Sequence, residues 1–168
     1  MTAVLSVGSN LGDRLGWLRL AVAVLGPHTV SPVYATSPVG GVEQGEFLNV
    51  VLLCALTADT AWERAQDAER RAGRERSVRW GPRTLDVDVV DAPPPVPAGL
   101  VVPHPRAHER AFVLAPWIDV APQAVLRGHG PVAALLDRLG REGVRRRDDL
   151  LLSVTRDSVT PDAVTPNL

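Results

Sequence analysis

Two acidic residues, Asp86 and Asp88, stand one residue apart within the stretch RWGPRTLDVDVVD. The apolar residues that alternate with them predict a strand, so both carboxylates are expected to leave the same face of a sheet. Neighbouring carboxylates repel one another unless a cation joins them, and Mg²⁺ prefers such hard oxygen ligands. This spacing fits a metal site and fits equally well two acids on a solvent-facing strand.

Arginine side chains gather just before this acidic pair, at Arg74, Arg76, Arg79 and Arg83. A metal on the phosphate oxygens, with guanidinium groups nearby to stabilise the developing charge, is what phosphoryl transfer requires. Trp80 lies among these arginines in a Trp-Gly-Pro turn, where it could hold the loop or close over a nucleotide. The alternative is a solvated basic loop that pairs with local acids.

A second group of residues suits a flat ligand. Phe47 and Asn49 have the same parity at the start of the apolar stretch FLNVVLLCAL, so they are expected to share a face. An aromatic ring beside an amide can receive a hydrogen-bonding heterocycle. An Asn bonded to local backbone at a bulge is the alternative, and Phe112 would more often be a core residue.

A third group, in the stretch VPHPRAHERAF, offers donors for phosphate: His104, Arg106, His108 and Arg110. A surface or capping role is the alternative, above all for His108. The sequence contains none of the common glycine-rich nucleotide motifs and no His-Glu-x-x-His zinc motif. A nucleotide would therefore bind outside those cradles.

Composition narrows the possible functions. The 168 residues suffice for one well-cored domain, and the net charge of −1 gives no reason to expect binding to nucleic acid or to a membrane. All 18 basic residues are arginine, which excludes a phosphate-binding or Schiff-base lysine. The single cysteine, Cys54, is expected to be an inert core residue. We find no signal-peptide pattern and no membrane-spanning run, so a cytoplasmic protein is expected.

The hydrophobic pattern predicts the elements that position these groups. Asp13 is expected to cap a first helix that Gly26 ends, and Asp59 to cap a second helix that Gly73 ends. Pro32 argues for an edge position or a bulge in the second strand. Strands are expected over residues 3–7, 29–36, 47–56 and 84–90, a surface loop over 37–46, and short helices within 110–122 and 131–140.

The resulting order, βαββαβ followed by short helices, predicts an α+β fold. We expect a ferredoxin-like sandwich whose central sheet is mostly antiparallel and carries helices on its faces. Residues 1–152 are expected to form a single domain. Residues 153–168 are polar and aperiodic, which predicts a flexible tail.

The chain resembles the 6-hydroxymethyl-7,8-dihydropterin pyrophosphokinases of folate biosynthesis. The resemblance runs from SVGSNLGDR through GEFLNVV and AGRERSVRWGPRTLDVDVV to VPHPRAHERAFVLAPWIDVAP, which is most of the domain. It implies transfer of a pyrophosphoryl group from MgATP to the pterin hydroxymethyl oxygen, with two Mg²⁺ ions and release of AMP. The implied partners are ATP and 6-hydroxymethyl-7,8-dihydropterin, bound by a monomer.

The resemblance also implies roles for individual residues. Arg74, Arg83, Asp86 and Asp88 would be catalytic, with both aspartates as metal ligands. Thr36, Pro38, Val39, Phe47, Asn49 and Phe112 would bind the pterin. Gln66, Glu69, Arg76, Trp80, Val89, Val101, His104 and Arg110 would lie on the ATP side.

Two other functions remain open on the sequence. A metal-dependent nucleotide hydrolase would use the same aspartate pair but leaves the Phe47–Asn49–Phe112 group unexplained. A catalytically silent ferredoxin-like module that binds a ligand is the other; the loss of Asp86, Asp88 or Arg83 would favour it, and all three are present.

Overall fold

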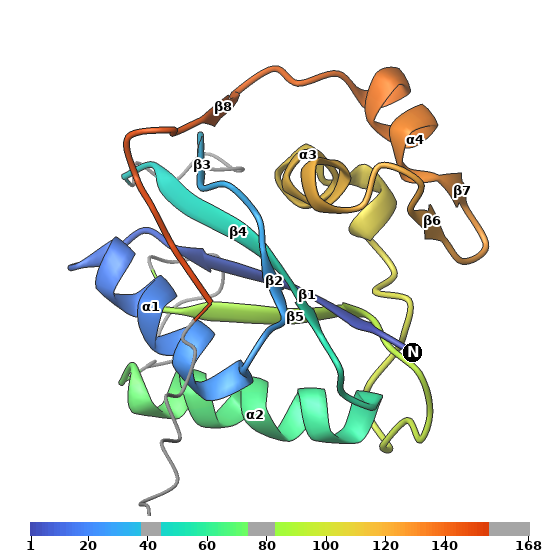
Figure 1. The fold of residues 1–168 in the computed structure, drawn as a ribbon, viewed down its shortest axis with the longest axis horizontal. Helices are drawn as coiled ribbons and strands as arrows, with labels where there is room; N and C mark the ends of the chain where they lie inside the picture. Colours follow the sequence, from blue (N-terminus) through green and yellow to red (C-terminus); the bar gives the residue numbers. More distant parts are fainter. Residues whose placement is uncertain (38–44, 74–82, 155–168) are drawn as a thin grey trace, which may run out of the picture.

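The computed structural model describes residues 1–37, 45–73 and 83–154. They form a six-stranded antiparallel sheet in the order β5-β1-β4-β3-β8, with β2 also paired to β4 (Figure 1). The strands are β1 (Ala3–Ser9), β2 (Thr29–Val30), β3 (Tyr34–Thr36), β4 (Phe47–Cys54), β5 (Asp86–Asp91), β8 (Val144–Arg146) and a separate β6 (Val125–Leu126) and β7 (Gly130–Pro131) pair. The helices are α1 (Arg14–Leu25), α2 (Ala58–Arg71), α3 (Ala111–Val120), α4 (Val132–Leu139) and a 3₁₀ turn at Ala107–Glu109.

Helices cover both faces of the sheet (Figure 1). Alternate residues of β1, such as Leu5 and Val7, pack with α1 and α2 in one fully buried cluster. Val4, on the opposite face of the same strand, belongs to a second cluster with α3 and α4. The predicted ferredoxin-like α+β fold is therefore confirmed, and the two-residue period of the strands divides the protein into two cores.

Helix ends follow local rules with one exception. Asp13 caps α1 as predicted, since its carboxylate accepts a hydrogen bond of 3.0 Å from the Gly16 N–H. Gly26 ends α1 in the left-handed conformation, with φ of +60°. The predicted cap Asp59 is wrong: the N-cap position of α2 is Thr57, and Asp59 lies in the first turn. The Asp59 carboxylate accepts from the Thr60 N–H at 2.7 Å, so it still binds a first-turn amide.

The expected strand over 29–36 is interrupted. Ser31, Pro32 and Val33 separate β2 from β3, and Pro32 has no N–H for a ladder. Ser31 bridges the break instead, because its N–H donates to the Val51 carbonyl at 2.9 Å and its Oγ accepts from the Val51 N–H at 2.8 Å. The chain is thus kept against β4 without a continuous strand.

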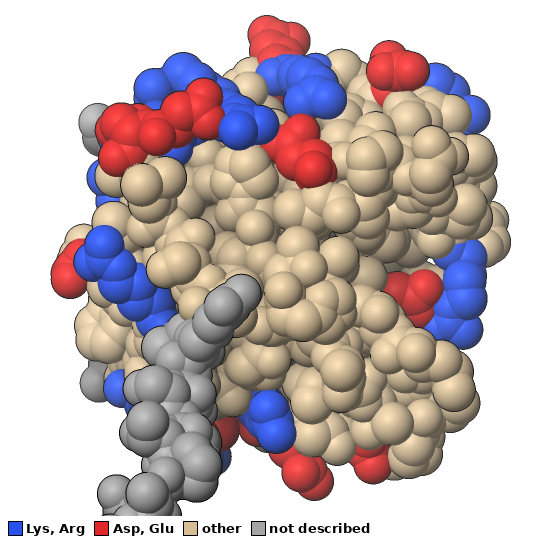
Figure 2. Space-filling model, in the orientation of Figure 1, with Lys and Arg blue, Asp and Glu red and all other residues tan. Residues whose placement is uncertain are grey.

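The α4 helix lies within its predicted range, whereas β6, β7 and β8 were not anticipated. Most of the predicted loop over 37–46 and most of the predicted tail lie outside the described residues. No helix in the described ranges is long and apolar enough to cross a membrane. On the face shown in Figure 2, acidic and basic side chains lie beside one another around the rim, and neither sign dominates it.

Candidate functional site

The predicted acidic pair and the predicted aromatic–amide group meet on one face of the sheet. Asp86 and Asp88 leave the side of the sheet on which α3 lies, where Asp88 meets Arg110, while Val87 and Val89 point into the core under α1 and α2. In the strand register, Gly8 of β1 pairs with Asp86 on one side and with Asn49 on the other. The aspartates and the amide therefore lie on adjacent strands around one glycine.

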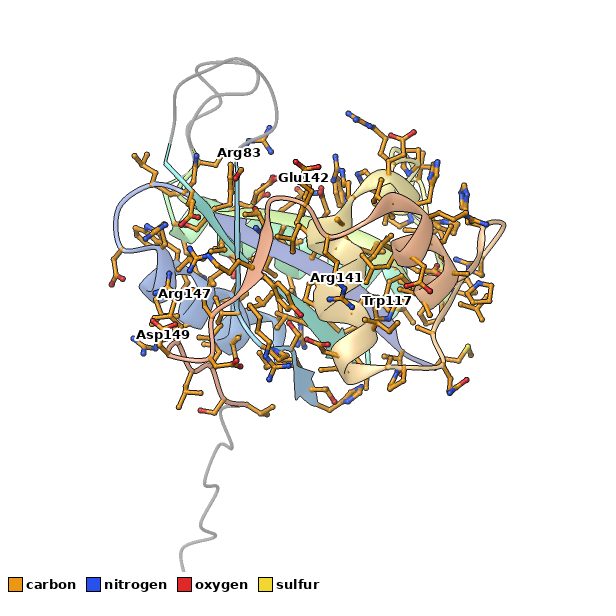
Figure 3. The ribbon with its side chains drawn as sticks, turned by 90° about the horizontal axis from the view of Figure 1, so that it is seen from above. Arg83, Trp117, Arg141, Glu142, Arg147 and Asp149 are labelled. Carbon is orange, nitrogen blue, oxygen red and sulfur yellow. The ribbon has the colours of Figure 1, made fainter. Side chains whose placement is uncertain are left out.

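Each aspartate is held by an arginine. Arg83 Nη1 lies 2.6 Å from Asp86 Oδ2, and Arg110 Nη1 lies 2.7 Å from Asp88 Oδ2. Asp86 and Asp88 keep 24% and 31% of their side-chain surface exposed, so a ligand can reach both carboxylates. Figure 3 shows Arg83 at the edge of the molecule on the same side as Glu142.

The donor set suits a divalent cation that also binds phosphate. No group of three or more His, Cys, Asp or Glu side chains converges on a metal position within the described ranges. Asp86 and Asp88 alone would leave most positions of an Mg²⁺ octahedron to water and phosphate oxygens, which is the usual arrangement for MgATP. A cation between them would take over the charge balance that Arg83 and Arg110 now provide, and both guanidinium groups would become available to phosphate.

His104 faces the same carboxylate as Arg110. Its Nε2 lies 3.9 Å from Asp88 Oδ2, and its Nδ1 accepts a hydrogen bond of 3.1 Å from the Arg106 N–H. Burial lowers the pKa of His104, although Asp88 acts in the opposite direction. A neutral ring whose Nδ1 is an acceptor carries its proton on Nε2, the ring nitrogen that lies nearest to the Asp88 carboxylate.

The predicted phosphate donors separate into two pairs. His104 and Arg110 reach Asp88, whereas Arg106 pairs with Glu109 at 3.2 Å and His108 stacks on His129 with ring centroids 4.0 Å apart. The 3₁₀ turn at Ala107–Glu109 makes this division, since it turns the chain between Arg106 and Arg110. Only His104 and Arg110 belong to the site.

The aromatic and amide group is built into regular structure. Asn49 is 4% exposed, lies in an unbroken ladder, and donates from Nδ2 to Thr36 Oγ1 at 2.8 Å. The alternative of an Asn at a bulge is therefore wrong. Phe112, at the start of α3, is only partly buried, and Arg110 Cζ lies 5.6 Å from its ring centroid. Phe112 thus packs against the edge of the second core and also faces the site.

Gly8 was missed by the sequence reasoning. A Cβ at this position would lie 2.6 Å from Asn49 Oδ1 and 3.6 Å from Phe47 Cδ1. Phe47 and Asn49 therefore do share a face, and both lean over Gly8. The predicted strand ended at residue 7, whereas β1 continues to Ser9 and so contains Gly8. A glycine within a strand often marks the close approach of another group, and that was the available signal.

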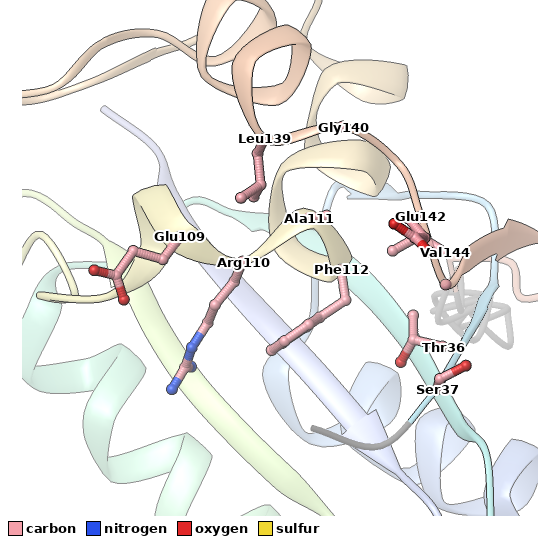
Figure 4. A pocket seen from close by; sticks show the side chains of 11 residues that line it. Thr36, Ser37, Glu109, Arg110, Ala111, Phe112, Leu139, Gly140, Glu142 and Val144 are labelled. Carbon is pink, nitrogen blue, oxygen red and sulfur yellow. The ribbon is translucent and has the colours of Figure 1, made fainter. Parts of the chain in front are cut away.

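A cavity of about 340 Å³ adjoins this group, and Thr36, Phe112 and Arg110 line it (Figure 4). The cavity also has a wall from the connection between α4 and β8, contributed by Leu139, Glu142, Val144 and the glycines between them. These C-terminal residues were not among the predicted site residues.

The remaining predicted residues are scattered around β5. Glu69 Oε1 accepts from the Val87 N–H at 3.0 Å, on the outer edge of the strand. Gln66 is exposed on α2, Val101 is 63% exposed, and Val89 is buried with its side chain under α1 and α2. Six of the candidate residues lie outside the described ranges: Pro38, Val39, Arg74, Arg76, Arg79 and Trp80.

Comparison with known proteins agrees with this geometry. Residues 4–122 match the family model described as 7,8-dihydro-6-hydroxymethylpterin-pyrophosphokinase. A 2-amino-4-hydroxy-6-hydroxymethyldihydropteridine pyrophosphokinase of Mycobacterium leprae is 49% identical over 179 residues, covering 92% of this chain and 93% of that protein. The protein of the same name from Bacillus subtilis is 43% identical over 131 residues, covering 72% and 78%.

The family match spans well over half of the chain. It includes both aspartates, their partners Arg83 and Arg110, and Asn49. The M. leprae relative extends this similarity over most of the sequence. The chain belongs to the 7,8-dihydro-6-hydroxymethylpterin-pyrophosphokinase family.

Proposed function

We propose that this chain transfers a pyrophosphoryl group from MgATP to the hydroxymethyl oxygen of 6-hydroxymethyl-7,8-dihydropterin. The observation that carries the proposal is the shared face: Asp86 and Asp88, each beside an arginine, lie next to Asn49 across Gly8. A metal–phosphate side and a heterocycle side within one site are what a two-substrate transfer requires.

On the phosphate side, Asp86 and Asp88 would hold two Mg²⁺ ions together with the ATP phosphates. The ions supply charge neutralisation on the phosphate oxygens and orient the reacting groups. Arg83 and Arg110 then turn from the carboxylates to the phosphates, where guanidinium groups bind oxygen pairs well. By family resemblance Arg74 joins Arg83 in this role, and His104 donates from Nε2.

On the pterin side, the edge of a flat bicyclic ring meets Asn49 and Thr36. Phe47 and Phe112 pack on its two faces, and Pro38 and Val39 complete the pocket by family resemblance. Asn49 is fixed before the ligand arrives, because its Nδ2 is bound to Thr36 and its Oδ1 lies over Gly8. A preformed polar edge costs little ordering free energy on binding.

The transfer forms one bond and breaks one bond. The pterin hydroxyl oxygen attacks the β-phosphorus, the bond from that phosphorus to the α–β bridging oxygen breaks, and AMP leaves with the electron pair. The hydroxyl proton passes to solvent. No covalent enzyme intermediate is required, so positioning and electrostatics carry the catalysis.

By family resemblance the ATP base side would use Gln66, Glu69, Val89 and Val101 together with Arg76 and Trp80. Val89 would contribute its backbone there, because its side chain is buried under α1 and α2. Both substrates would bind within one protomer's sheet face, so a monomer would suffice for the activity. It works in the cytoplasm, the compartment that supplies ATP.

The direct test is AMP release from purified protein. We expect AMP only when Mg²⁺, ATP and 6-hydroxymethyl-7,8-dihydropterin are all present. Asp88→Ala should lower this rate at least about 100-fold, in line with the loss of one key charge in an active site. Asp91→Asn changes a carboxylate of the same strand that binds Arg127 instead, and it should stay active.

The outcomes separate the candidate functions. AMP or ADP formation without any pterin would point to a nucleotide hydrolase. Absence of AMP with all three components present, from folded protein, would leave a ligand-binding module. A fully active Asp88→Ala variant would remove the metal role from this aspartate.

A further inference from the structure

The C-terminal strand β8 is bound along the whole of β3. The register pairs Tyr34 with Arg146 and Thr36 with Val144. The pairing continues beyond the strand at both ends: the Ser37 N–H donates to the Gly143 carbonyl at 3.1 Å, and the Arg147 N–H donates to the Val33 carbonyl at 2.8 Å. β8 therefore fixes the strand that presents Thr36 to the site.

β8 is also tied to α3, the helix that presents Phe112. The Asp119 carboxylate of α3 accepts from Tyr34 Oη at 2.7 Å, and Arg146 Nη1 lies 3.4 Å from the same oxygen. Burial, reinforced by Asp119, raises the pKa of Tyr34, so the phenol remains a donor. One carboxylate of α3 is thus held by β3 and β8 together.

The same segment contributes a side chain to the cavity beside the candidate site. Val144 lines this cavity beside Thr36, its partner in the β3–β8 register, and near Phe112 (Figure 4). Val144 is partly buried and packs against the cluster under α3. Figure 3 shows the chain passing from Glu142, on the side of Arg83, to Arg147 and Asp149 on the far side of the molecule.

We propose that Val144 is a specificity-determining residue of the pterin pocket, and that β8 sets the spacing between Thr36 and Phe112. The ligand class is a flat bicyclic heterocycle with a fused pyrimidine ring. This inference rests on the proposed function, because it assigns the cavity to the pterin side. Val144 contributes an apolar wall from a third element, where β3 supplies a hydroxyl and α3 an aromatic ring.

The test is a change of side-chain volume at the wall. Val144→Phe fills the cavity and should raise the KM for the pterin about 10-fold or more, the effect expected of overpacking a fitted site. The dissociation constant for MgATP should change less than about twofold, because the Asp86–Asp88 side is untouched. Val144→Ile, a conservative variant, should keep a pterin KM close to that of wild type.

Arg145→Phe is the matched control. Arg145 is the next residue of β8, pairs with Ala35 on the opposite face, and keeps 63% of its side chain exposed. A phenylalanine introduced at this position should leave the pterin KM and the kcat unchanged. A thermal melt for each variant separates a change of pocket from a loss of folding.

A second variant covers the case in which Val144→Phe does not fold. Val144→Ala enlarges the cavity and should weaken discrimination between the pterin and an analogue with an added alkyl group. If the folded Val144 variants keep the pterin KM and the discrimination of the wild type, the role of Val144 is refuted, while the proposed function stands. A wild-type protein that makes no AMP would refute the proposed function and this inference with it.

Discussion

Gly8 faces Asn49 across the β1–β4 ladder, and no room for a methyl group remains between them. A Cβ on residue 8 would lie 2.6 Å from Asn49 Oδ1, well inside van der Waals contact. The Asn49 side chain cannot simply swing away, because its Nδ2 is bound to Thr36 and the residue is 4% exposed. The absence of a side chain at residue 8 thus determines where the amide lies.

Gly8→Ala should therefore damage pterin binding. Overpacking of this kind costs about 1–3 kcal/mol, so the pterin KM should rise about 10-fold and the free energy of unfolding should fall. Without such a clash, replacing glycine by alanine in a strand would stabilise the folded protein, because it reduces the conformational freedom of the unfolded chain. Steady-state kinetics and a urea titration of the two proteins provide the measurements.

The double variant Gly8→Ala/Asn49→Ala isolates the cause. Removing the Asn49 amide removes the clash, so the stability lost in Gly8→Ala should be largely recovered while pterin binding stays weak. If the two substitutions simply add in stability, the contact between these residues is not what makes the glycine necessary.

Arg83→Ala should slow the chemical step and leave pterin affinity largely unchanged. Arg83 Nη1 lies 2.6 Å from Asp86, on the aspartate side of Gly8 and away from the Thr36–Asn49 pair. Loss of one charge-stabilising donor typically costs about 100-fold or more in rate. Single-turnover AMP formation measures the step, and a pterin titration in the presence of a non-hydrolysable ATP analogue measures affinity. Arg127→Ala, which removes the partner of Asp91, is the control; a selective loss of pterin affinity in Arg83→Ala would contradict this role.

Cys54 should be unreactive in the folded protein. Burial raises the pKa of its thiol from 9.0 to about 12, so almost no thiolate exists at pH 8. A thiol reagent should label the protein in denaturant within minutes and the native protein only as fast as it unfolds. Rapid labelling of native protein would show that β4 opens locally at this position.

The same shift has a defined effect on stability. Above pH 9 the unfolded chain loses the thiol proton while the folded chain keeps it, so the free energy of unfolding contributed by Cys54 falls as pH rises from 9 toward 12. Wild type should therefore lose more stability than Cys54→Ala over this range.

Local patterns predicted the faces on which the candidate site residues lie. The two-residue period of a strand is a local property, so the shared faces of Asp86 with Asp88 and of Phe47 with Asn49 could be inferred without knowing the sheet. Their proximity could not be inferred in the same way. It depends on the register that puts β1 between β4 and β5, which is set by long-range pairing.

Other features were not predictable for different physical reasons. β8 reads Val-Arg-Arg and lacks apolar alternation, because it is an edge strand held mainly through its backbone. His104 and His108 are both possible phosphate donors in sequence, yet His108 lies inside the 3₁₀ turn and stacks on His129, so only His104 reaches Asp88. The N-cap of α2 is Thr57 and not Asp59. Both residue types are favoured at N-caps and they stand two positions apart, so the sequence could not decide between them.

The hydrogen bond from the Val87 N–H to Glu69 has a consequence for solution behaviour. β5 is an outermost strand of the sheet, and outermost strands with free amides can recruit a strand from another molecule. The Glu69 carboxylate of α2 accepts a hydrogen bond from the outward-facing N–H of Val87, the residue between Asp86 and Asp88. A chain adding at this edge would have to expel a charged group first, so the strand that carries both aspartates is guarded against self-association and aggregation.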